Sequence, residues 1–285
     1  MHAQKHVLEG SIPRGPLARF WPLALALAML FALPLILKGF GRALGPNVIN
    51  LKLQYQPPSR THLFGTDALG RPLLARTLLG TGLSLEVAAR ALAIAFVLAI
   101  VLGAIAGNTK GRWPDLAISW MIALLHTIPF VLIAIAVAAV LLPGLTSISI
   151  VIGIVAWAAP ARIVRAEVMV LRSARFVAAQ RAFGFHPVTI FFRSVLPLCV
   201  VPPLASLLYL LPELIGIDVG LSFFGLGAQP PIPTVGRLVY DGLNLFQNGW
   251  WLAVAPASLL LLFFLILYAC LAGSKIARQY RAYGF

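Results

Sequence analysis

Long apolar runs, each about as long as a membrane is thick, constrain this chain more than any other feature. A helix needs about 20 mostly apolar residues to cross the hydrocarbon core of a bilayer. Six such runs lie at residues 20–37, 83–106, 116–142, 148–166, 198–219 and 250–272. Because 60% of the residues are hydrophobic and only 11% are charged, an ordinary soluble domain is excluded. We therefore predict an all-α polytopic membrane protein with about six transmembrane helices.

Basic residues predict how these runs are oriented. The chain carries 22 Lys and Arg against 8 Asp and Glu, and its net charge is +14. Fourteen of the 22 lie in the two tails and around the ends of the second and fourth runs, and one orientation places all of these segments inside. We therefore predict cytoplasmic N- and C-termini. Because the basic residues flank apolar runs, we expect contact with membrane lipid and no nucleic-acid partner.

This topology divides the chain into four segments. Residues 1–19 form a cytoplasmic tail without a cleavable signal pattern, and residues 20–82 hold the first helix and a long outer loop. Residues 83–272 form a transmembrane domain of five helices, with a cytoplasmic loop at about 161–197, and residues 273–285 form a second cytoplasmic tail. The His and Cys residues show no metal-ligand spacing, so no metal site is predicted.

The segment RFVAAQRAFGFHPVTIFFRSVLPL, residues 175–198, is basic and contains no acid. A helix is predicted over 161–183, because this stretch avoids helix breakers and is rich in Ala. Gly184 follows at a position where a left-handed backbone ends many helices, and Pro187 suits the first turn of a second helix. We predict a helix-turn-helix with a cationic tip. It docks either on another protein or, as an amphipathic helix, on anionic lipid.

Few charged residues lie inside the apolar runs. Glu86 and Arg90 are one helical turn apart and are expected to neutralise each other. Glu213 and Asp218 lie late in the fifth run. Glu213 is expected to be the deeper and costlier acid, and Asp218 to lie near the outer surface, where hydration costs less. Whether Glu213 lines a path or only packs stays open.

Gly103 and Gly107 form a small-xxx-small pattern within the second run. Small residues at this spacing allow two helix backbones to approach closely. The pattern predicts helix packing and carries no information on mechanism.

Three stretches, in this order along the chain, resemble the motifs of one family. Residues 175–198 resemble the cytoplasmic EAA loop of binding-protein-dependent ABC importer permeases. HLFGTDALGRPLLAR, residues 62–76, and LSFFGLGAQPPIPTVG, residues 221–236, are similar to motifs of the dipeptide, oligopeptide and nickel importer permeases, in the branch of the second permease. The resemblance covers the chain from about residue 60 onward.

The resemblance implies partners and candidate site residues. A homologous second permease would complete a heterodimer, two ATPase subunits would carry ATP and Mg²⁺, and an extracytoplasmic binding protein would deliver the solute in the inner membrane of a bacterium. The residues implied to couple to the ATPase are Phe176, Ala178, Ala179, Gln180, Arg181, Gly184, Phe185, His186 and Pro187. The outer-loop motif comprises Gly65, Thr66, Asp67, Gly70 and Arg71. The outer-face motif comprises Asp218, Ser222, Gly225, Gly227, Gln229 and Pro230, with Glu213 as a candidate path acid.

Several positions depart from the family pattern. Ala178 stands where the family usually has Glu, Gln180 where it has Ala, and Ser194 where it has His. The missing Glu removes a salt bridge to the ATPase, so we expect the shape of the loop to carry the docking. Asp67 is interpreted mainly as a residue that fixes the loop shape.

The chain contains no phosphate-binding loop, so it is expected to have no enzymatic activity or cofactor of its own. We predict a permease subunit for peptides or a related small solute, with nickel or a metal–chelator complex as the second choice of cargo. Two other hypotheses are an ion-coupled secondary transporter, with Glu213 or Asp218 as the ion site, and a structural scaffold.

Overall fold

The chain folds into a bundle of helices. The computed structural model describes residues 21–129, 132–133, 135–136, 140, 144–223 and 226–272. The two predicted tails and Gly225 lie outside these residues. Within them there is no β-strand, only an isolated bridge between Thr66 and Pro72. The helices are α1 (Trp21–Ala43), η2 (Leu51–Leu53), α2 (Leu73–Asn108), α3 (Trp113–Thr127), α5 (Leu145–Ala156), α6 (Ala158–Arg172), α7 (Arg175–Ala182), α8 (Pro187–Ile190), η3 (Phe191–Val195), η4 (Leu196–Cys199), α9 (Val201–Phe223), α10 (Val235–Asn244) and α11 (Trp251–Ala272).

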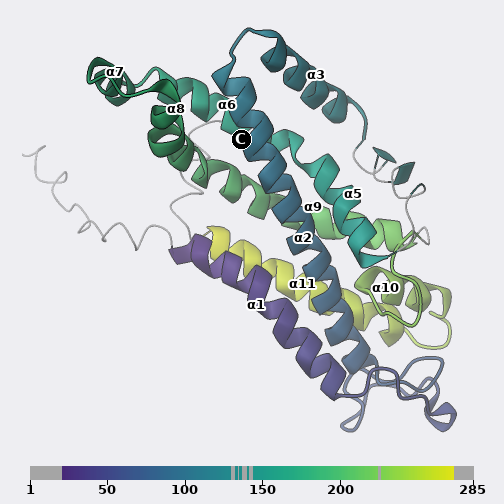
Figure 1. Cartoon of the computed structure of the whole chain (residues 1–285). Helices are drawn as coiled ribbons and strands as arrows, with labels where there is room; N and C mark the ends of the chain where they lie inside the picture. The colour runs from purple at the N-terminus through teal and green to yellow at the C-terminus, as the bar shows by residue number, and fades with distance from the viewer. Residues whose placement is uncertain are drawn as a thin grey trace, which may run out of the picture.

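Helix α2 is the central element of the bundle. It has 36 residues and lies against α1, α5, α6 and α9, and also touches α3, α10 and α11 (Figure 1). Its buried side chains are mostly Ala and Leu, which join those of α5, α9 and α11 in one apolar core. A helix of this length is about 54 Å long, longer than the hydrocarbon core of a bilayer. The other helices therefore have one common surface to pack on.

Small residues set the distance between α2 and α6. A Cβ atom on Gly103 would lie 2.6 Å from the carbonyl oxygen of Ala161, and one on Gly107 would lie 2.7 Å from Cβ of Val168. Distances this short leave no room for any side chain. The packing interpretation of the Gly103/Gly107 pattern is confirmed, and its partner is α6.

The two ends of the bundle carry different elements (Figure 1). At the first, which we call the coupling end, lie α7, α8, the end of α2 and the start of α3; Arg172 donates to the carbonyl of Asn108 there. At the other, the outer-loop end, residues 44–72 and α10 lie beside the start of α2. The predicted topology likewise places these two groups on opposite sides of the membrane.

The lengths of the predicted spans agree only in part with the helices. Among the described residues, three helical stretches are long and apolar enough to cross a membrane, Leu73–Asn108, Pro187–Leu204 and Trp251–Ala269. The predicted fourth span is instead two helices, α5 and α6, bent by 43°. Helix α2 begins ten residues earlier than predicted, because its first turns pack Leu73 and Arg76 against the outer loop and α10. The count of six spans stays a prediction.

Two helix ends also differ from the prediction. The predicted helix over 161–183 is wrong as a single element, since α6 ends at Arg172 and Ala174 is extended. The Ser173 hydroxyl donates to the carbonyl of Val170 at 2.8 Å, which competes with the helical pattern. In the third predicted span, α3 ends at Thr127 shortly before Pro129, and much of the remaining run lies outside the described residues.

The contact between α2 and α6 makes a first prediction. Gly103→Ala should destabilise the bundle by about 1–3 kcal/mol, because the added methyl forces two backbones apart. The control is Gly39→Ala in α1, where an added Cβ meets no atom within 4 Å. The control should be neutral or slightly stabilising. Thermal unfolding of the two purified variants in one detergent would measure the difference, and equal transition temperatures would contradict the prediction.

Candidate functional site

The loop at the coupling end begins with the short helix α7, which ends at a glycine as predicted. Gly184 has φ +82°, in the left-handed region. The N–H of Phe185 donates to the carbonyl of Gln180 at 3.1 Å, and the N–H of Gly184 donates to that of Arg181 at 3.0 Å. This pair of hydrogen bonds is the Schellman arrangement, which satisfies the last carbonyls of a helix. The chain direction after α7 is therefore fixed by Gly184.

The second helix of the loop starts at Pro187, also as predicted. The Nδ1 atom of His186 accepts from the N–H of Val188 at 3.3 Å, so the imidazole caps the helix. Pro187 occupies the first turn, where its missing N–H costs nothing. The helical path then continues through η3, a π-helical turn, and η4 into α9. The loop is thus joined directly to the long helix α9.

One side chain anchors α7 to the bundle. Val177 is 1% exposed and belongs to a small apolar cluster with Ala104 of α2, Val164 and Val168 of α6, and Ile190 of α8. This cluster is separate from the main core, so the loop packs on apolar side chains that are not part of that core. A displacement of α7 would move the neighbouring helices with it, since packed apolar side chains are hardly compressible.

Two of the departures from the family pattern contact each other. The side-chain amide of Gln180 donates to the hydroxyl of Ser194 at 2.9 Å, which ties α7 to η3. Sequence reasoning treated these two positions separately. Their pairing could be recognised only once the fold had brought them together.

The tip of the loop is fully available to a partner. All residues from 181 to 189 are exposed, as are Phe176, Ala178 and Ala179. Phe183 and Phe185 expose 82% and 53% of their surface, and a Cβ atom on Gly184 would meet no atom within 4 Å. The tip therefore presents aromatic side chains next to arginines, with no acid within it.

An ion pair stiffens the base of this loop. Asp115 of α3 is buried, and its carboxylate accepts from Nε and Nη2 of Arg165 in α6 at 2.6 and 3.1 Å. The N–H of Gly111 also donates to this carboxylate, at 2.8 Å. Sequence reasoning gave Asp115 no partner, because Arg165 is fifty residues away in the chain and only tertiary packing brings the two together.

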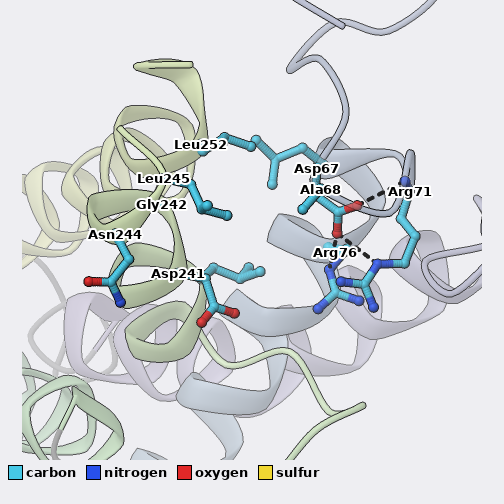
Figure 2. A pocket seen from close by; sticks show the side chains of 11 residues that line it. Asp67, Ala68, Arg71, Arg76, Asp241, Gly242, Asn244, Leu245 and Leu252 are labelled. Carbon is cyan, nitrogen blue, oxygen red and sulfur yellow. Dashed lines mark hydrogen bonds and ion pairs between the residues drawn. The ribbon is translucent and has the colours of Figure 1, made fainter. Parts of the chain in front are cut away.

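At the outer-loop end, Asp67 holds the loop together (Figure 2). One carboxylate oxygen accepts from the N–H groups of Leu69 and Arg71 at 2.9 and 3.0 Å. The other accepts from Nε of Arg71 at 2.7 Å and forms an ion pair with Nε of Arg76 at 3.4 Å. These contacts support the interpretation of Asp67 as a residue that fixes the loop shape.

The rest of the outer-loop motif has structural roles as well. Thr66 is buried, and its hydroxyl accepts from the N–H of Gln56 at 2.9 Å and donates to the carbonyl of Leu53. Gly65 and Gly70 have φ +73° and +68°. A Cβ atom on Gly70 would lie 1.8 Å from the carbonyl oxygen of Asn50, so only glycine fits. The motif is a folded unit packed on the start of α2.

A cavity of about 160 Å³ lies between this loop and α10. Figure 2 shows Asp67, Arg71 and Arg76 on one side and Asp241 on the other. Asp241 itself pairs with Arg237, one turn before it, at 3.0 Å. Each charged group of the cavity thus has a partner of opposite charge nearby.

The outer-face motif is divided between the core and the surface. Ser222 is 2% exposed, and a Cβ atom on Gly227 would lie 2.3 Å from its hydroxyl oxygen. Gln229 and Pro230 are exposed on the loop that leads to α10. The motif therefore packs the end of α9 against the following loop and leaves a short surface segment beyond it.

The two acids of α9 are buried to different extents within the chain. Asp218 is completely buried and Glu213 is exposed within this chain. Burial within the chain depends on the face of the helix, and the carboxylate of Asp218 lies beside Ser84 of α2. The depths of the two acids in a bilayer stay a prediction. On α2, the predicted ion pair between Glu86 and Arg90 is confirmed. Lys38 of α1 forms a second ion pair with Glu86.

Comparison with known families identifies the chain. Residues 99–274, more than half of the sequence, match the family described as "Binding-protein-dependent transport system inner membrane component". The chain belongs to this family. It is therefore a multi-pass permease component of an ABC importer of the inner membrane, the class of system in which ATPase and substrate-binding partners work with the permease. The matched region includes α7, α8 and the outer-face motif.

Individual relatives agree with this assignment. The chain is 33% identical to the dipeptide transport system permease protein DppC of Bacillus subtilis, over 82% of this chain and 74% of the relative. It is 30% identical to the oligopeptide transport system permease protein OppC of the same organism, over 73% and 68%. Its fold is similar to a chain of the MetNI methionine ABC transporter in inward facing conformations, with a TM-score of 0.55, 21% identity, and coverage of 73% of this chain and 97% of that chain.

The contacts of Asp67 make a second prediction. Asp67→Asn should weaken the outer loop by about 1–3 kcal/mol, because it leaves the nearly buried guanidinium of Arg76 without its countercharge. Trypsin should then cut after Lys52, an exposed residue of the same loop, several times faster in the purified protein. Asp241→Asn, which changes an acid with a 43% exposed side chain across the same cavity, is the matched control. Cleavage that stayed at the wild-type rate in Asp67→Asn would contradict the role of Asp67.

Proposed function

We propose that this permease forms half of the translocation path of an importer for peptides. A homologous second permease completes the path as a heterodimer, embedded in membrane lipid. Two ATPase subunits bind at the coupling end and hydrolyse ATP, and an extracytoplasmic binding protein delivers peptide to the outer-loop end. Support for peptide as the cargo comes from the relatives, which are named for dipeptide and oligopeptide transport.

The observation that carries the coupling role is the combination of an exposed tip with an anchored base. The tip around Gly184 offers open surface, while Val177 fixes α7 to α2, α6 and α8. A partner that binds the tip and displaces it would therefore also displace α2, α6 and α8. This is the arrangement required of an element that transmits motion from an ATPase to the membrane helices.

The composition of the tip indicates what kind of groove receives it. Arg175 and Arg181 are exposed, and no acid lies between them and the end of the loop. Phe183 and Phe185 add apolar surface. A groove on the ATPase with acidic residues around an apolar floor complements this surface, and it needs no basic residue opposite Ala178.

Gly184 provides the test of this proposal. Gly184→Val should uncouple ATP hydrolysis from peptide uptake, because a β-branched residue resists φ +82° and the turn between α7 and α8 would change. The steric space around the position is open, so the effect comes from backbone conformation and not from a clash. Uptake into proteoliposomes that contain the whole complex should fall at least tenfold, while basal ATP hydrolysis persists.

Two control variants make this test specific. Gly184→Asn should retain most of the uptake, because Asn tolerates the left-handed conformation. Ala178→Glu should also be tolerated, because the side chain is exposed and an acid is favourable in the first turn of α7. Uptake by Gly184→Val at the wild-type rate would refute the coupling role, and binding of the tip to anionic vesicles in place of the ATPase would support the interfacial-helix alternative.

Nickel or a metal–chelator complex is the second choice of cargo for this permease. The named relatives favour peptide. Mass spectrometry of the ligand carried by the cognate binding protein would distinguish the two, since a peptide and a metal complex differ in mass and isotope pattern.

A further inference from the structure

Asp218 is the most unusual residue of the bundle. It lies on α9, is completely buried, and forms no ion pair among the described residues, with only the hydroxyl of Ser84 indicated beside its carboxylate there. A buried carboxylate without a countercharge is strongly unfavourable, all the more so in a protein that lies in lipid. Something positively charged must therefore accompany it.

Hydroxyl groups from three elements lie at the junction of α2, α9 and the start of α10, where Asp218 is buried. Ser222 lies one turn further along α9, and Thr234 caps α10 and donates to the Ser222 hydroxyl at 3.4 Å. Ser84 of α2 lies close enough to Asp218 to interact with its carboxylate, and it accepts from the N–H of Val235 at 3.4 Å. One turn before Ser84, the buried hydroxyl of Thr81 has no partner among the described residues.

The space at this junction is small. A Cβ atom on Gly236 would lie 2.8 Å from Cβ of Ser222, and one on Gly80 would lie 3.2 Å from the carbonyl oxygen of Pro233. Helices α2, α9 and α10 are therefore in close contact here. The close packing excludes an organic solute and limits any occupant to a proton or a bare ion.

Most charged side chains on the elements around α9 form ion pairs with residues other than Asp218. On α2, Glu86 and Arg90 pair with each other and with Lys38, and Arg76 lies beside Asp67. On α10, Arg237 pairs with Asp241, and on α6, Arg165 pairs with Asp115. The remaining charged residues of α6 are Arg162, Glu167 and Arg172, and α5 and η4 have none. None of these residues forms an ion pair with Asp218 in the part of the chain that the structure describes.

We propose that Asp218, together with the hydroxyls of Ser84, Ser222 and Thr234, is a buried binding site for a small monovalent cation, either a proton or an alkali ion. Carboxylate and hydroxyl oxygens are the ligands that hard cations prefer. A single carboxylate balances a single positive charge. Because one chain supplies every group, the site is complete without the second permease.

The site has a consequence for the outer-loop end. It lies where α10 meets α2 and α9, and a bound cation keeps this junction electrically neutral and dry. If α10 moves away, water reaches the carboxylate and the cation is released. Occupancy then favours the close packing of α10, although ATP remains the energy source for transport.

Infrared spectroscopy of the purified full-length permease, reconstituted in lipid at neutral pH, tests the site directly. In choline buffer, the wild type should show the C=O stretching band of a protonated buried carboxyl, and Asp218→Asn should lack it. Glu213→Gln, an exposed acid of the same helix, is the matched control and should leave the band unchanged. Ser84→Ala should shift the band, because it removes the hydroxyl beside the carboxyl.

Replacing choline with Na⁺ or K⁺ distinguishes the two cations. A band that persists in all three salts identifies a proton, and a band that disappears in Na⁺ or K⁺ identifies an alkali ion that displaces it. The proposal is overturned if two results are obtained together. No infrared band depends on Asp218, and Na⁺ or K⁺ raises the unfolding temperature of the wild type by no more than that of Asp218→Asn. The measurement needs no ATPase or cargo, so its outcome is independent of the function proposed above.

Discussion

The close contact between α2 and α6 is the constraint on which the rest of the structure depends. Without side chains at Gly103 and Gly107, the two helices approach so closely that no larger residue fits at these positions. In lipid, where the hydrophobic effect does not drive helix association, such close packing is a main source of specificity. Helix α6 leads to the loop that contains α7 and α8, and α2 follows the outer loop, so this contact joins the two ends of the bundle.

Charged side chains are neutralised by different contacts at the two ends of the bundle. At the coupling end, Asp115 and Arg165 form a tight pair beneath a loop whose arginines stay exposed. At the outer-loop end, Asp67 satisfies two backbone N–H groups and two arginines. Each arrangement fixes a loop against the helices without an isolated charge. Asp218, near the junction of α2, α9 and α10, is by contrast a buried carboxylate without an ion pair in the described part of the chain.

The turn of the coupling loop could be predicted from sequence because its determinants are local. Gly184 needs only its own φ and two hydrogen bonds within one helix end, and Pro187 acts within its own helix. The break at Ser173 was missed, because a serine inside a helical pattern is compatible with both a continued and an interrupted helix. The 43° bend between α5 and α6 was missed for a related reason: hydropathy measures how apolar a run is, not whether it is straight.

The sequence by itself determined the class of the protein, its all-helical character and the positions of its motifs, because hydropathy, glycine placement and turn chemistry act over a few residues. Only the tertiary structure decided which distant side chains meet. It paired Gln180 with Ser194 and Asp115 with Arg165, and it buried Asp218 while leaving Glu213 exposed. The physical reason is that burial and pairing depend on the face of a helix and on its neighbours, and no local pattern in the chain specifies those.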